Sequence, residues 1–97
     1  MADIIRMDYA GMEQLIAAFR QANGALLDVQ GAEGKMAGLV ENGALLGVAG
    51  EHLVSVINGP LMKATGKLAE KMSEEASDCA KAMEIMKQHD QEAAGRF

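Results

Sequence analysis

The sequence predicts an all-α protein, an antiparallel two-helix hairpin that dimerises into a four-helix bundle. Apolar residues recur at helical spacing in two long segments, and a glycine-rich stretch separates the segments. Aromatic residues make up only 3% of the chain, so its core must consist of aliphatic and alanine side chains. Such side chains favour closely packed helices over a sheet. A chain of 97 residues supports one small domain.

The first helix is predicted from residue 8 to about residue 41. Asp8 is expected to cap its N-terminus. The apolar residues of this segment form a stripe with a 3.5-residue period, and such a stripe needs another helix to cover it. The residues expected to pack along it are Met12, Leu15, Phe19, Leu26, Val29 and Met36.

A turn at residues 42–47 and a second helix over residues 48–92 are predicted next. The apolar stripe of the second helix includes Ile57, Leu61, Leu68 and Met72. Asn58-Gly59-Pro60 would normally stop a helix, because proline lacks a backbone donor and clashes with the preceding turn. The stripe stays in phase across Pro60, which indicates a kink near 58–60; a break into two helices is the alternative. Residues 93–97 are expected to form a flexible tail.

A second heptad pattern of small residues lies on the other side of the first helix. Gly24, Gly31 and Gly38 continue a series that begins with two alanines. Each glycine inside a helix costs about 0.8–1 kcal/mol relative to alanine. We interpret the stripe as a surface for close approach of another helix; a solvated face is the alternative interpretation.

Composition and spacing exclude several classes of function. The net charge of −5 argues against nucleic-acid binding, and no apolar run is long enough to span a membrane. The N-terminus lacks the pattern of a secretory signal peptide. His52, His89 and Cys79 have no companions at metal-ligand or catalytic spacing. We therefore expect no enzyme activity, no metal and no cofactor.

The predicted turn carries a short motif. Leu45-Leu46-Gly47 is followed by Ala49 and by Leu53. This arrangement resembles the turn of the WXG family of small type VII (ESX-type) secretion substrates, with Leu45 in place of the tryptophan. The resemblance extends over nearly the whole chain and implies a helical hairpin of about 100 residues.

The C-terminal part of the chain is similar to the export signal of that family. Met86, Asp90, Ala93 and Phe97 stand at the spacing of the signal, with Met86 in place of its tyrosine. The resemblance implies that these residues form the secretion signal.

The resemblance also implies a function and partners. The protein would pair with itself or with a related hairpin, and it would act as an effector or as an escort for a larger secreted partner. It would be cytoplasmic before export and would leave the cell through the type VII secretion ATPase, without a cleavable signal peptide. The alternative is a cytosolic helical adaptor or chaperone that is not exported.

Overall fold

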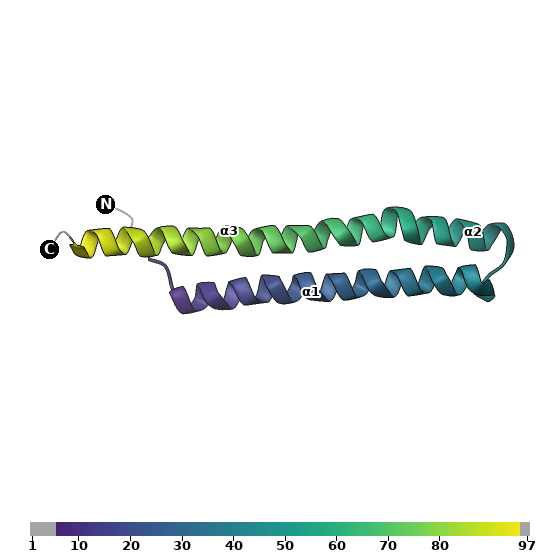
Figure 1. Cartoon of the computed structure of the whole chain (residues 1–97), viewed down its shortest axis with the longest axis horizontal. Coiled ribbons are helices and arrows are strands. Elements are labelled where there is room, and N and C mark those ends of the chain that lie inside the picture. Colours follow the sequence, from purple (N-terminus) through teal and green to yellow (C-terminus); the bar gives the residue numbers. More distant parts are fainter. Residues whose placement is uncertain (1–5, 96–97) are drawn as a thin grey trace.

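The protein is a hairpin of two long antiparallel helical arms (Figure 1). The computed structural model describes residues 6–95, with side chains described as far as Glu92. Its elements are α1 (Tyr9–Leu39), the segment η1 (Val40–Ala44), in which Gly43 departs from helical geometry, α2 (Gly47–Val56), the π-helical turn η2 (Ile57–Leu61) and α3 (Met62–Gly95). The hairpin measures 75 × 22 × 16 Å, and its radius of gyration is 21.7 Å. A compact domain of this length would have a radius of about 13 Å, so the hairpin is strongly extended.

Local chemistry sets the two ends of the first arm. Asp8 caps α1, as predicted, because its side chain accepts a hydrogen bond from the backbone N–H of Gly11 at 3.1 Å. The turn depends on Gly43 and Gly47, whose φ angles of 112° and 79° lie in the region that glycine tolerates best. Gly50 is buried directly behind the turn, where a Cβ atom would lie 2.1 Å from the carbonyl oxygen of Leu45. No larger residue therefore fits at position 50 without moving the turn.

The seam between the arms follows a heptad pattern on α1. Its buried and half-buried members are Met12, Ile16, Phe19, Asn23, Leu26, Gln30, Glu33, Ala37 and Val40. Small residues line much of the facing seam of α3, where Ala69 and Ala76 are buried. Helices with small facing residues can approach closely, so polar side chains of α1 can reach the α3 backbone.

Two side-chain amides fix the register of the arms. Asn23 donates to the carbonyl oxygen of Ala69 at 2.7 Å, and Gln30 donates to that of Met62 at 3.2 Å. The Gln30 amide passes over Gly66, where a Cβ atom would lie 2.9 Å from its nitrogen. The donors are one heptad apart on α1 and their acceptors one heptad apart on α3. A slip of either arm would break both bonds.

At several places the residue that lies in the seam is not the predicted one but the next residue in the sequence. Met12, Phe19 and Leu26 lie in the seam as expected, and Ile57 is buried. By contrast, Leu15, Val29, Met36, Leu61 and Leu68 were expected to pack between the two helices, and all five are exposed. Each of them directly precedes a seam residue. α1 carries two adjacent heptad stripes, and the more polar one, with Asn23 and Gln30, faces α3.

The second arm continues through Pro60 without a break. Proline cannot donate the backbone hydrogen bond of an ordinary α-helical turn, and here the chain passes through the wider turn η2. A π-helical turn adds one residue to the helix, so Leu53 and Leu61, which are eight apart, occupy equivalent positions on the arm. The arm begins at Gly47, and Ala93–Gly95 of the expected tail belong to α3. Residues 96–97 lie outside the described residues.

Glu33 is the one buried charged residue among those described. Its side chain is only 2% exposed, and neither carboxylate oxygen has a hydrogen-bond partner. The register of the two amide bonds places it opposite the Asn58–Pro60 part of η2. Burying a polar group without a partner costs free energy. Glu33 therefore weakens the middle of the seam.

Replacement of Glu33 tests this cost. We expect Glu33→Leu to raise the free energy of unfolding by about 1–3 kcal/mol, because the variant removes two unpartnered acceptors. Urea unfolding followed by circular dichroism measures the change. The control is Glu13→Leu at an exposed position of α1, with an expected change within about 0.5 kcal/mol. Equal effects of the two substitutions would contradict the assignment.

Candidate functional site

The hairpin leaves one broad side uncovered, and the geometry of helices identifies the residues on it. Successive residues of an α-helix are about 100° apart. Two antiparallel right-handed helices rotate in opposite senses when seen from one end. A residue directly before a seam residue on either arm therefore lies on the same side of the hairpin.

Large apolar side chains gather on this side, which we call the apolar face. It comprises Leu15, Val29, Met36 and Leu39 on α1, Leu53 and Val56 on α2, Leu61 in η2 and Leu68 on α3. These side chains are between 39% and 63% exposed. Four alanines of α1 occupy the positions between its larger members: Ala18, Ala22, Ala25 and Ala32. The apolar face is therefore continuous and carries no charge along α1.

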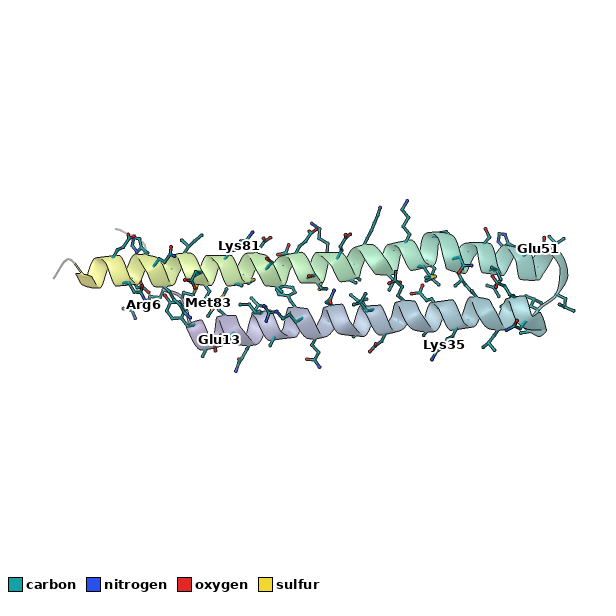
Figure 2. All side chains as sticks on the ribbon, viewed as in Figure 1. Arg6, Glu13, Lys35, Glu51, Lys81 and Met83 are labelled. Atoms are coloured by element: carbon teal, nitrogen blue, oxygen red, sulfur yellow. The ribbon has the colours of Figure 1, made fainter. Side chains whose placement is uncertain are left out.

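The apolar face does not continue to the open end of the hairpin, where α1 begins and α3 ends. On α3 the equivalent positions after Leu68 include Glu75, Ala82 and His89. The face is therefore concentrated around α1 and the half of the second arm nearest the turn. Figure 2 places Met83 between the arms near the open end, where it contributes to the seam.

The opposite side of the hairpin is polar and glycine-rich. Gly24, Gly31 and Gly38 each follow a seam residue and lie on this side, away from the apolar face. Apart from the adjoining residues and the neighbouring backbone of α1 itself, no atom of the described residues lies within 4 Å of a Cβ placed at any of the three. The hairpin itself therefore gives no packing reason for these glycines.

The residues of the turn motif have separate roles. Gly47 supplies the positive φ angle that opens α2, and Ala49 lies one residue before buried Gly50. Leu53 belongs to the apolar face. Leu45 lines a hollow of about 340 Å³ beside the turn, together with Val40, Leu46 and Val54. Leu45 is 42% exposed, so it only partly fills the space at the end of the hairpin.

The C-terminal residues of the predicted signal lie where α3 extends past the start of α1 (Figure 1). Asp90 is exposed and accepts a hydrogen bond from the Tyr9 hydroxyl at 2.5 Å. The Lys87 ammonium lies 5.6 Å from the centre of the Tyr9 ring. Met86 is half-buried. The side chain of Ala93 and all of Phe97 lie outside the described residues.

Tyr9 was not identified from the sequence, because it stands 81 positions away from Asp90. Only the register of the arms brings them together. The hydrogen bond to Asp90 raises the pKa of Tyr9 above its ordinary value of 10.0, and partial desolvation and the Asp90 charge act in the same direction. This cluster ties the beginning of α1 to the end of α3.

The described part of the chain contains no cluster of three or more His, Cys, Asp or Glu side chains placed to hold a metal ion. Cys79 is free and half-buried. Within residues 6–95, no helix combines the length and apolar character that crossing a membrane requires.

The Tyr9–Asp90 bond predicts a pH dependence. Tyr9 is the only tyrosine and the chain has no tryptophan, so ultraviolet absorbance follows its ionisation directly. We expect the phenol to titrate above pH 10 in the folded protein and closer to 10 in Asp90→Ala. Because the folded-state pKa is raised, the bond stabilises the protein below about pH 10 and is lost as the pH rises through that pKa. An unchanged titration in Asp90→Ala would refute this contact.

Comparisons with known protein families, curated proteins and solved structures found no match to this chain. The resemblance to the WXG family thus rests on the quoted motifs and on the shape of the hairpin, which is consistent with that family.

Proposed function

We propose that this protein is a helix–helix association module whose apolar face pairs with the same face of a second hairpin to form a four-helix bundle. The observation that carries the proposal is the apolar face itself, to which eight of the thirteen exposed large apolar residues in the described chain belong. Exposed apolar surface of this extent is typical of protein interaction sites.

The size of the apolar face suits a stable interface. From Leu15 to Leu39 the stripe is about 36 Å long at 1.5 Å per residue, and two adjacent helices are about 20 Å wide. The face therefore covers roughly 700 Å² per hairpin. Standard protein interfaces bury about 800 Å² per partner. Helices in such bundles pack with side chains interleaved between them, and the alternation of alanine with larger residues on α1 permits this.

We further propose that the paired hairpin is a substrate of a type VII secretion system. In this role it acts as an effector or as an escort for a larger secreted partner. The turn motif and the hairpin shape support this assignment. The C-terminal signal would then be read at the exposed end of α3, where Asp90 lies. A cytosolic adaptor that binds a partner through the same face is the competing function.

Two leucines provide a matched test of the association surface. Leu68 lies on the apolar face and is 49% exposed, while Leu27 lies on the opposite side and is 51% exposed. We expect Leu68→Asp to weaken self-association at least tenfold, because it would bury a charge in the interface. Leu27→Asp should leave association unchanged. Sedimentation velocity measures both, and equal effects of the two variants would argue against the proposed surface.

Secretion is tested in cells that contain a working type VII system. We expect the protein in the culture supernatant, and we expect removal of residues 86–97 to retain it in the pellet. The Leu27→Asp variant serves as the control for a substitution remote from the signal. Protein found only in the pellet, from the full-length chain and the truncated chain alike, would reject export and favour the cytosolic adaptor.

A further inference from the structure

The turn end of the hairpin carries apolar surface that does not belong to the apolar face. Five exposed large apolar residues of the described chain lie outside that face, and three of them, Leu45, Leu46 and Val48, are at the turn. Leu46 is 77% exposed and Val48 is 82% exposed, the two highest values among these side chains. Side chains this exposed contribute little to the packing of the hairpin, and a cluster of them is typical of an interaction site.

The hollow beside the turn offers this surface a place for a side chain from another molecule. Leu45 and Leu46 line it together with Val40 and Val54, and its volume is about 340 Å³. Ligand-binding pockets in proteins have volumes of about 300–1,000 Å³. Gly50 also lines the hollow, and it lies too close to the backbone of Leu45 for a side chain at position 50 to fill the space.

The hollow opens away from the apolar face. None of the eight residues of the apolar face lines it. Its two charged residues, Glu41 and Glu51, directly follow Val40 and Gly50, which are half-buried and buried between the arms. Both glutamates therefore lie on the side of the hairpin opposite to the apolar face. A second hairpin seated on the apolar face would leave the hollow accessible, so the hollow is a separate surface.

The rim of the hollow is acidic and has no counter-charge nearby. Glu41 and Glu51 are exposed, and neither forms an ion pair with a described residue. Figure 2 shows Glu51 at the turn end of the hairpin. The chain has no lysine or arginine between Lys35 and Lys63. A positive charge brought by a partner would therefore complement this rim.

The apolar hollow and its acidic rim together specify the chemistry of an occupant. A large apolar side chain fits the hollow, and a lysine or arginine beside it fits the rim. Nucleic acids and anionic lipid headgroups do not match, because the rim carboxylates would repel their phosphates. A second copy of this chain matches poorly, since each copy carries a net charge of −5.

We propose that the turn hollow is a docking site for a segment of a different protein in which large apolar side chains are flanked by arginine or lysine. The apolar side chains enter the hollow between Leu46 and Val54, and the basic side chains pair with Glu41 and Glu51. This docking goes beyond the proposed pairing of hairpins and does not depend on it, because the two surfaces lie on different sides.

Binding of short peptides to the full-length chain tests this inference. The probe is the peptide Ala-Arg-Leu-Phe-Arg-Ala with both termini blocked, and its matched control has glutamate in place of both arginines. Nuclear magnetic resonance of the isotope-labelled protein measures binding and reports which backbone amides the peptide approaches. We expect the basic peptide to shift the amide signals of residues 40–54 saturably, and we expect the acidic peptide to leave them unchanged.

Variants of the rim test the contribution of charge. Glu41→Gln combined with Glu51→Gln should weaken binding of the basic peptide about fivefold, because two exposed ion pairs are lost. The matched control combines Glu70→Gln with Glu84→Gln, which changes the net charge equally at two exposed positions of α3. This control should bind the peptide as the unchanged chain does.

Variants of the exposed apolar residues test the contribution of the hollow. Leu46→Ser should weaken binding about threefold, because the peptide then buries less apolar surface. Ile85→Ser is the control at a position that is 65% exposed and far from the turn, and it should have no effect. Both substituted side chains are exposed, so neither change should disturb the fold.

Three results would overturn the inference: equal binding of the two peptides, equal losses in the matched variants, or no saturable shift at the turn with millimolar peptide. Light scattering on the rim variant and its control tests the other occupant. A change of mass in the rim variant alone would assign the hollow to a second copy and would also overturn the inference. Equal masses in the two variants would support docking of a different protein.

Discussion

A hairpin of two helices has a single seam, and in this protein the seam has polar residues at its centre. The side-chain amides of Asn23 and Gln30 donate hydrogen bonds to backbone carbonyl oxygens of α3. The buried Glu33 carboxylate has no hydrogen-bond partner. Few apolar side chains of the described residues are buried: Ile16, Ile57 and three alanines. The seam therefore specifies the register well and contributes little apolar burial.

The remaining apolar residues are placed outward because of this seam. Once the polar stripe of α1 faces α3, the neighbouring stripe with Leu15, Val29 and Met36 must lie on the apolar face. The extra residue in η2 keeps Leu53 and Leu61 on that same face despite Pro60. Stability and association are thus linked. The apolar face is the surface that pairing with another hairpin would bury, and that burial would stabilise the fold.

The sequence was sufficient to predict the hairpin and the N-cap at Asp8. It was not sufficient to choose between two adjacent heptad stripes on α1. The stripe through Leu15 and Val29 is the more apolar, so periodicity alone assigned it to the seam. The choice depends on α3, whose Gly66 and buried alanines allow Asn23 and Gln30 to approach its backbone. The Tyr9–Asp90 contact could not be predicted from the sequence either, because it depends on the register of the two arms.

We expect one hairpin to be half of an assembly. The most direct measurement is the solution mass of the purified full-length chain by light scattering over a dilution series, with circular dichroism on the same samples. We expect a mass of twice 10.2 kDa, with helicity falling as dilution separates the chains. A mass of 10.2 kDa at every concentration, with full helicity retained, would contradict it.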